Sequence, residues 1–354
     1  MKVLVTGSGG LIGSEACFHW LRRGADVVGI DNNMRRIFFG PLGDITPNIR
    51  NLSKHKKYQH LDVDIRDRKE ILSIIKVLKP DVIIHTAAQP SHDKAANIPF
   101  EDFDTNAVGT LNLLEAARLE ALGCIFIHIS TNKVYGDVPN KIPMIEYEKR
   151  YDYSLEEALD FPGLSQKGIN EKMSIDQSLH SLFGASKIAA DVLAQEYGRY
   201  FGMNVGIFRG GCLTGPQHAG VELHGFLSYI IKCAVKGNFY TIFGYKGKQV
   251  RDQIHCSDVI TAFDCFIENP KPGEVYNLGG CKENSASILE VIDILKEQHD
   301  LDLNYKITND NRSGDHVCYY TDMSKFKNDY PEWKTMWSLQ DIIDDIIKNI
   351  RKEL

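Results

Sequence analysis

The sequence lacks an apolar run long enough to cross a bilayer, and its first apolar segment, Lys2–Thr6, follows no signal peptide. It also lacks a basic excess: 41 lysines and arginines stand against 47 acidic residues, giving a formal net charge of −6. We therefore expect neither nucleic acid nor a membrane surface as a partner.

The eight cysteines lack both CxxC pairs and the spacing of metal ligands. We expect reduced thiols in a cytoplasmic protein, and no bound metal. Repeats and low-complexity tracts are absent too. With 354 residues, 43% of them hydrophobic, the chain is long enough for one large domain and a smaller lobe.

What the sequence does contain is a glycine cluster, Gly7-Ser8-Gly9-Gly10-Leu11-Ile12-Gly13, between an apolar strand and a segment of helical period. A second apolar run ends at Asp31, which completes a strand-turn-helix-strand unit. We expect Gly7 to form the turn, Gly10 to admit a pyrophosphate and Gly13 to let helix and strand approach. Leu11 and Ile12 are then further cofactor contacts. The alternative is a glycine-rich turn that binds nothing.

Asp31 and Asn32 follow the second strand, where an acidic side chain accepts hydrogen bonds from an adenosine ribose and repels a 2′-phosphate. This position favours NAD over NADP as the cofactor. Arg35 and Arg36 are arguments against it, because either guanidinium could reach a 2′-phosphate.

Apolar runs and helical periods then alternate, which predicts an α/β doubly wound parallel sheet. The expected strands are 58–63, 81–85, 124–129 and 205–209, and the expected helices are 67–78, 107–122 with Asn106 opening it, and 181–200. Residues 32–57 are expected to form a loop with one short helix. Small residues Ala87 and Ala88, followed by Gln89, would let the backbone pass close to a dinucleotide.

The sequence pattern changes at Gly210, and a smaller α/β substrate lobe is expected from that residue onward. It should contain an amphipathic helix over 223–236 and a tail helix over 339–350. We assign 1–209 and about 250–268 to the dinucleotide-binding domain, with an insertion at 137–180. We assign 210–249 and 269–354 to the lobe. The insertion is expected to be a lid or a substrate-facing segment that carries short helices.

The glycine spacing and the string Ser130-Thr131-Asn132-Lys133-Val134-Tyr135-Gly136 resemble the extended, nucleotide-sugar branch of the short-chain dehydrogenase/reductases, the NAD-dependent epimerase/dehydratase family with its Rossmann-type sheet. The resemblance implies that Asp64 and Ile65 hold the adenine. It also implies that Asn106 steadies the fourth strand through a water, and that helices 107–122 and 184–200 pair in a homodimer. Asp64 could instead cap the helix over 67–78.

The same resemblance implies a nucleotide diphosphate sugar as substrate. Residues 240–252 look like the family's hairpin that grips the diphosphate, continued in register by 254–259. Residues 275–280 look like a further strand of the family, and residues 312–315 like a further nucleotide contact. Arginine pairs bidentately with phosphate, although an isolated arginine is more often a surface ion-pair residue. The expected substrate-binding residues are Thr131, Asn132, His180, Arg209, Tyr240, Arg251, Arg312 and Asp315.

The catalytic set departs from the family pattern. In this superfamily a tyrosine four residues before a lysine moves the hydroxyl proton, and the lysine holds the nicotinamide ribose. Lys187 is present, but residue 183 is phenylalanine, which cannot exchange a proton. Either another group serves as acid/base, or the protein binds its ligands without chemistry. Lys133 is the first candidate, because it follows the substrate-facing Thr131; it could equally be an exposed loop lysine. Further candidates are His92, His180, Tyr151 and Tyr153.

Related 4,6-dehydratases place Asp-Glu after the threonine to eliminate water, whereas this chain has Asn132-Lys133. Dehydration is therefore not expected. The string 130–137, together with 185–191 and 247–252, is most similar to the CDP-paratose (CDP-tyvelose) 2-epimerases. That similarity implies transient hydride transfer to NAD at carbon 2 of a CDP-dideoxyhexose. Epimerisation at carbon 4 and a catalytically silent binding protein remain the alternatives.

Overall fold

The computed structural model describes residues 1–218, 220–222, 225–310 and 314–352. The chain divides into two compact units. Unit 1 comprises Met1–Val134, Leu182–Arg209 and Cys256–Tyr276; unit 2 comprises Tyr135–Ser181, Gly210–His255 and Asn277–Leu354. Among the described residues, no helix combines the length and the apolarity needed to cross a membrane.

Unit 1 is built on a seven-stranded sheet with the order β14-β10-β5-β4-β1-β2-β3. Strands β1 to β5 pair in parallel, and the strand order reverses between β1 and β4. Such a reversal is the switch point at which doubly wound sheets bind their ligands. The predicted α/β class with a parallel sheet is confirmed. The strands are β1 (Lys2–Thr6), β2 (Asp26–Ile30), β3 (Tyr58–Leu61), β4 (Val82–His85), β5 (Ile125–Thr131), β10 (Asn204–Gly210) and β14 (Glu274–Leu278).

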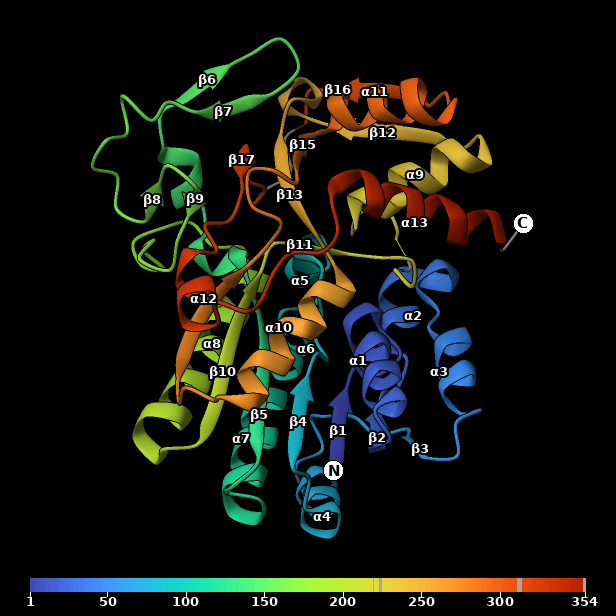
Figure 1. The fold of residues 1–354 in the computed structure, drawn as a ribbon, viewed down its shortest axis with the longest axis vertical. Helices are drawn as coiled ribbons and strands as arrows, with labels where there is room; N and C mark the ends of the chain where they lie inside the picture. Colours follow the sequence, from blue (N-terminus) through green and yellow to red (C-terminus); the bar gives the residue numbers. More distant parts are fainter. Residues whose placement is uncertain (219, 223–224, 311–313, 353–354) are drawn as a thin grey trace. The chain divides into compact units, whose positions relative to one another are not determined.

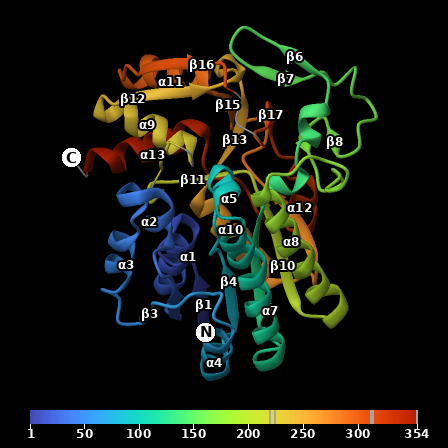
Figure 2. The same ribbon diagram turned by 180° about the vertical axis from the view of Figure 1, so that it is seen from behind.

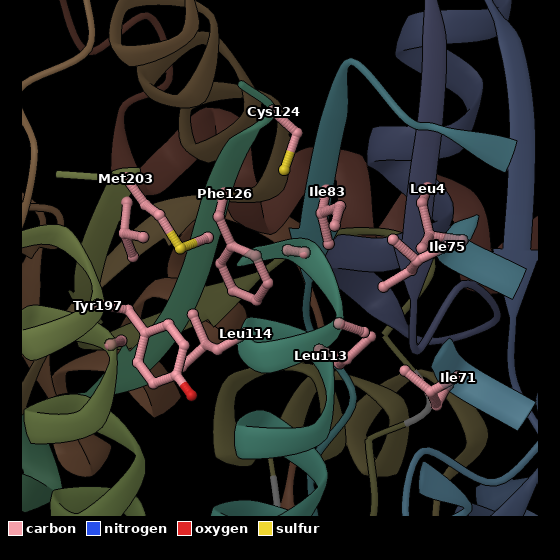
Figure 3. Packing of buried hydrophobic residues seen from close by; sticks show 14 of the residues in the cluster. Leu4, Ile71, Ile75, Ile83, Leu113, Leu114, Cys124, Phe126, Tyr197 and Met203 are labelled. Atoms are coloured by element: carbon pink, nitrogen blue, oxygen red, sulfur yellow. The ribbon is translucent and has the colours of Figure 1, made fainter. Parts of the chain in front are cut away.

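Helices cover both faces of this sheet. On one face α1 (Leu11–Arg22) contacts α10 (Cys256–Glu268) (Figure 1), and on the other lie α4 (Arg68–Leu78), α7 (Gly109–Glu120) and α8 (Leu182–Phe201) (Figure 2). The core between the sheet and α4, α7 and α8 is apolar (Figure 3); it includes Leu4, Ile75, Ile83, Leu113, Leu114, Phe126 and Tyr197. Fully burying one such aliphatic or phenylalanine side chain stabilises the fold by about 1.5–3 kcal/mol. The strands read as continuous apolar runs because both of their faces are covered.

Two segments of unit 1 differ from the prediction. Residues 32–57 form α2 (Met34–Phe39), a 3-10 turn and α3 (Thr46–Leu52), not a loop with one short helix. Asn106 does not open a helix, because it lies within a π-turn that joins α6 (Pro99–Phe103) to α7. Hydrophobic periodicity did not predict α6, because the residues that this helix buries include the polar Asp102, which is 1% exposed.

Unit 2 gathers its apolar core around three helices, α9 (Phe226–Lys236), α11 (Ile288–His299) and α13 (Leu339–Lys352). Five isoleucines of α13 are buried, as expected of the predicted amphipathic tail helix. The helix expected over 223–236 is α9, which begins at Phe226; residues 223 and 224 lie outside the described residues. The remaining elements are β11 (Cys212–Thr214), β12 (Phe239–Phe243), β13 (Val250–His255), β15 (Ser285–Ser287), β16 (Asn304–Thr308), β17 (Cys318–Tyr319) and α12 (Ser324–Asp329).

The predicted hairpin over 240–252 is wrong. Strand β12 pairs in parallel with β16, whereas β13 pairs with β11, β15 and β17. Four successive residues, 244–247, have φ between 48° and 76°, so the chain makes a left-handed turn between β12 and β13. The expected continuation over 254–259 is also wrong, because β13 ends at His255 and α10 begins at Cys256.

Residues 135–181 belong to unit 2, and one short helix of the 3-10 type is found there, where several short helices were expected. These residues form a 3-10 turn (Val138–Lys141) and two small antiparallel pairs, β6 (Met144–Glu146) with β7 (Tyr151–Tyr153), and β8 (Leu164–Ser165) with β9 (Gly168–Ile169). The Tyr151 amide donates to the Lys248 carbonyl at 3.0 Å, and Ile169 bridges to Thr321. Backbone bonds therefore tie this segment to the rest of unit 2.

Candidate functional site

The glycine turn after β1 is built as the sequence predicts. Gly7 has φ +70°, and a Cβ there would lie 2.7 Å from the Ala87 nitrogen. A Cβ on Gly13 would lie 2.0 Å from the Gly7 carbonyl oxygen, so only glycine lets α1 start this close to the turn. Gly10 is the N-cap of α1 and provides no side-chain cap, which leaves the first-turn amides of Leu11 and Ile12 without one. Amides at such a helix end suit a pyrophosphate.

Asp31 lies directly after β2 and contacts the glycine turn. Its carboxylate accepts hydrogen bonds from the Gly9 and Asn33 amides, both at 2.9 Å. Burial raises its pKa, and these amide bonds oppose that rise. The Asn32 side chain donates to Asp64 at 3.2 Å, so the structure brings together the residues predicted for ribose and adenine.

Asp64 does not cap the helix that follows it. The N-cap of α4 is Asp67, whose carboxylate accepts from the Lys69 and Glu70 amides. Asp64 instead forms an ion pair with Arg66 at 2.6 Å. Burial raises its pKa, but the hydrogen bonds from Arg66 and Asn32 outweigh burial, and the net shift is downward.

The segment after β4 passes close to the glycine turn at Ala87, as expected of small residues there. Asn106 holds this segment directly: it accepts from the Gln89 amide at 2.9 Å and donates to the Gln89 carbonyl at 3.1 Å. The Gln89 side chain, fully buried, donates to Asp102 at 2.7 Å. The backbone and the side chain of Gln89 are therefore both hydrogen-bonded to other residues of unit 1.

The carboxyl end of β5 presents the predicted catalytic threonine. Thr131 ends the strand, and its hydroxyl accepts from the Lys133 amide at 3.2 Å as the chain enters a 3-10 turn over Asn132–Tyr135. Asn132 is 5% exposed, whereas Thr131 and Lys133 are half-buried. Lys133 is therefore not the fully exposed loop lysine of the alternative interpretation.

Lys187 lies on α8, and its ammonium donates to the Ile129 carbonyl of β5 at 2.7 Å. Burial lowers its pKa to about 8, against the opposing pull of Asp191 and Asp102. Two buried histidines, His85 and His128, stay neutral, because burial first and Lys187 second lower their pKa values. Phe183, one helical turn before Lys187, is 6% exposed and packs against His92.

Sequence reasoning missed a buried ion pair beside this lysine. Asp191 accepts from Arg209 at 2.9 Å and from the Ser130 hydroxyl at 2.5 Å. Burial raises the pKa of Asp191, but the charge and hydrogen bonds of Arg209 outweigh burial, so the net shift of the Asp191 pKa is downward. Helical period could have placed Asp191 on the buried face of α8 with Ala190 and Ala194, but it could not have named Arg209 as the partner. Arg209, predicted to bind substrate, is thus engaged by a carboxylate of its own unit.

The nucleotide residues predicted in the lobe lie in unit 2. Arg251 on β13 and Asp315 are brought together, with 3.7 Å between guanidinium and carboxylate. Arg251 is 8% exposed, so it is not the surface ion-pair residue of the alternative interpretation. Tyr240 on β12 is buried and packs against Tyr229. Arg312 lies outside the described residues.

Three of the alternative acid/base candidates also belong to unit 2. The Tyr153 hydroxyl is buried and donates to the Cys318 carbonyl at 2.6 Å, and burial raises its pKa well above the ordinary value. His180 is half-buried, with its Nε2 3.2 Å from the Ser178 hydroxyl. Tyr151 is half-buried on β7. Of these three side chains, Tyr153 is the one whose hydroxyl is buried and hydrogen-bonded to the backbone of its own unit.

Two family models match this chain. Residues 4–154 match the model described as GDP-mannose 4,6 dehydratase, and residues 162–279 match the NAD dependent epimerase/dehydratase family. Together they span parts of both structural units.

Individual relatives agree with this assignment. CDP-paratose 2-epimerase of Salmonella typhi is 32% identical over 349 residues, which is 96% of this chain and 96% of that protein. A dTDP-glucose 4,6-dehydratase of Salmonella typhimurium is 30% identical over 84% of this chain and 77% of its own. A mutant UDP-glucuronic acid 4-epimerase from Bacillus cereus, solved with a UDP-sugar analogue and NAD, superimposes with a TM-score of 0.79 at 25% identity over the whole of both chains. With its glycine turn, its Thr131 strand end and its Lys187 helix in place, this chain is an enzyme of the NAD-dependent epimerase/dehydratase family.

Proposed function

We propose that the protein is a nucleotide-sugar epimerase that inverts carbon 2 of a CDP-dideoxyhexose. The observation that carries this proposal is the 32% identity to CDP-paratose 2-epimerase over 96% of both chains. Asn132 and Lys133 add support, because they stand where the resemblance places the two carboxyl groups of a dehydratase.

NAD is the cofactor in this proposal. The uncapped first turn of α1 suits its pyrophosphate through Leu11 and Ile12, and Asp31 suits the adenosine ribose. When bound, NAD would supply a reversible hydride acceptor for the sugar carbon, so that hydride removed from one face of the sugar and delivered to the other would leave no net consumption of NAD. Lys187 holds the nicotinamide ribose, and Asp64 and Ile65 lie beside the adenine.

The side chains at the end of β5 handle the hydroxyl. Thr131 hydrogen-bonds the oxygen of the reacting carbon. Lys133 takes the hydroxyl proton as the carbon is oxidised to a ketone and returns a proton to the same oxygen when the ketone is reduced. The half-buried position of Lys133, whose amide donates to the Thr131 hydroxyl, supports this role.

The nucleotide diphosphate is assigned to two arginines. Arg251 and Arg312 bind the diphosphate, and Asp315 orients Arg251. Asn132, His180, Arg209 and Tyr240 are the further substrate contacts of the proposal. The preference for cytidine rests on the relative's identity alone.

Two alternatives have an observation of their own. Phe183 favours a protein that binds NAD and nucleotide sugar without turnover. The structural likeness to a UDP-glucuronic acid 4-epimerase favours inversion at carbon 4.

Isotope tracing separates the three. Purified protein is incubated with CDP-paratose carrying deuterium at carbon 2, with a second sample carrying it at carbon 4, and both are followed by NMR. We expect inversion at carbon 2 with the deuterium retained, because an enzyme-held hydride does not exchange with water. Inversion at carbon 4 would support the 4-epimerase. Inertness towards CDP-, UDP-, GDP- and dTDP-sugars, combined with activity of Phe183→Tyr, would identify a silenced relative.

We also propose a cytoplasmic homodimer. All eight cysteines are free, which suits a reducing compartment. Unit 1 exposes large apolar side chains on α7 and α8, namely Leu119, Val192, Tyr200 and Phe201. Covering them with the same helices of a second copy would remove apolar surface from water. Light scattering at micromolar concentration should give twice the chain mass, and a monomer mass would contradict the dimer.

A further inference from the structure

Phe183, at the position where the family pattern has a phenol, packs against the polar aromatic side chain of His92. Its ring and that of His92 lie 4.8 Å apart between centroids, at an interplanar angle of 64°. His92 is the first residue of α5 (His92–Asn97) and Phe183 belongs to the first turn of α8; both are in unit 1. The contact is edge-to-face, the arrangement that aromatic pairs prefer.

A chain of hydrogen bonds fixes this contact. The Ser186 hydroxyl, on α8 between Phe183 and Lys187, donates to Asp102 at 2.6 Å. Asp102 accepts from the Gln89 side chain at 2.7 Å, and Gln89 in turn accepts from the Ser91 amide at 2.6 Å. His92 is therefore held relative to the helical turn that carries Phe183 and Lys187.

The same network is almost fully buried. Gln89, Ser91, Asp102 and Ser186 are each at most 1% exposed. Ser91 also caps α5 by accepting from the Lys94 amide. A buried polar network of this kind stabilises one arrangement, because leaving any of its members unpaired is costly.

The two rings of this pair differ in their ability to form hydrogen bonds. Phe183 offers carbon alone, whereas an imidazole offers two nitrogens that donate or accept hydrogen bonds. His92 is half-buried, so part of the ring stays accessible while another part packs on Phe183. In the family pattern the residue at position 183 brings a phenol oxygen to the hydroxyl of the reacting carbon.

We propose that His92 binds the hexose of the nucleotide sugar, its imidazole hydrogen-bonding the hydroxyl that the missing phenol of residue 183 would have met. The proposal rests on the proposed function for its substrate class, a nucleotide diphosphate hexose. Lys133 remains the group that moves the proton, and His92 positions the hydroxyl for it.

The test is a double-mutant cycle read by calorimetric binding. His92→Phe keeps an aromatic ring against Phe183 and removes both nitrogens, and Phe183→Tyr in the same protein restores a hydroxyl. Dissociation constants are measured for CDP-paratose and for CDP. We expect His92→Phe to weaken CDP-paratose about tenfold, the equivalent of about 1.4 kcal/mol, and to leave CDP unchanged. The double variant should recover most of that loss.

A matched control is available within unit 1. His55 makes the same kind of edge contact with Phe18, at 5.8 Å and 71°, but on an exposed surface. His55→Phe should change neither constant. Equal losses for CDP and CDP-paratose, an unchanged affinity in His92→Phe, or no recovery in the double variant would each overturn the proposal.

The binding readout also separates this proposal from the proposed function. If the wild type binds another nucleotide hexose better than CDP-paratose, the cycle is run on that sugar and its own nucleoside diphosphate. A hexose-specific loss there upholds His92 even when carbon 2 is not inverted. If no hexose among CDP-, UDP-, GDP- and dTDP-sugars adds to the affinity of its diphosphate, the assignment of His92 is wrong.

Discussion

Strands β1 and β5 belong to the same sheet, but the candidate site uses backbone groups at the end of β1 and side chains at the end of β5. After β1 the site is backbone: the turn depends on Gly7 and Gly13, and the first amides of α1 are its ligand groups. After β5 the site is made of side chains, with the Thr131 hydroxyl, the Lys133 amine and, from the neighbouring helix, Lys187.

This difference determines which substitutions each end tolerates. A backbone site tolerates loss of side-chain chemistry but not an added carbon, because the space is already filled to within 2.0 Å at Gly13. A side-chain site tolerates changes of shape better than loss of a functional group. Phe183 illustrates the second case, since an aromatic ring remains where the family pattern has a phenol.

The largest effect is expected at the β5 end. Lys133→Met keeps the length of the side chain and removes the amine that moves the proton. Turnover should fall by about a hundred- to ten-thousand-fold, the range of general acid–base catalysis. Initial rates with CDP-paratose measure it, and Lys76→Met on the exposed face of α4 is the control. Unimpaired turnover would place the acid/base on another residue, with Tyr151 and His180 next.

At the β1 end the decisive change is an added methyl group. Gly13→Ala would place a Cβ 2.0 Å from the Gly7 carbonyl, and overpacking of this kind costs about 1–3 kcal/mol. NAD affinity should fall by roughly five- to 150-fold. Gly123→Ala is the matched control, because a Cβ there meets nothing within 4 Å. Unchanged NAD affinity in Gly13→Ala would break the contrast between the two ends.

Asp31 combines the two kinds of group, because its side chain hydrogen-bonds the backbone of the glycine turn. Asp31→Ala should reduce any preference for NAD over NADP by about tenfold, because a charge-assisted hydrogen bond contributes about 1.5–3 kcal/mol. Titration with both oxidised cofactors measures the ratio, with Asp26→Ala on the exposed start of β2 as control. Tighter NADP binding by the wild type would contradict the assignment of NAD.

Lys187 predicts a pH dependence at the β5 end that the β1 end lacks. Its pKa of about 8 means that the ammonium is lost as the pH rises through 8, so NAD affinity should weaken several-fold between pH 7 and pH 9.5. Unfolding does not explain such a loss. An unfolded lysine keeps its proton to higher pH, so this residue's contribution to stability grows with pH over the same range. Lys187→Arg should flatten the profile measured by calorimetry, and an equally steep profile would assign it to another group.

The smallest effect is expected from restoring the phenol. Phe183→Tyr adds one oxygen beside Lys187 and should change wild-type turnover by no more than about threefold, less than 1 kcal/mol. Steady-state rates measure it. A gain of several orders of magnitude would show that the β5 end has lost its chemistry rather than rebuilt it.

The sequence determined the parts of the fold that local periodicity encodes. The strand-glycine-helix start, the buried parallel strands and the tail helix follow from short-range patterns, because apolar residues at period 2 or 3.6 commit a segment to one face. The same holds for the β1 end of the site, where turn, helix start and Asp31 lie within 31 residues. The side-chain identities at Thr131, Lys133, Phe183 and Lys187 were equally plain, and with them the missing phenol.

Only the tertiary structure decided which residues meet across long separations. Strand β12 pairs with β16 rather than β13 because a left-handed turn redirects the chain, and residues 135–181 join unit 2 through backbone bonds to Lys248 and Thr321. Asp191 with Arg209, and His92 with Phe183, are contacts no periodicity announces. Their partners are chosen by the packing of helices on a sheet, and the free energy of that packing depends on the whole fold rather than on any segment of it.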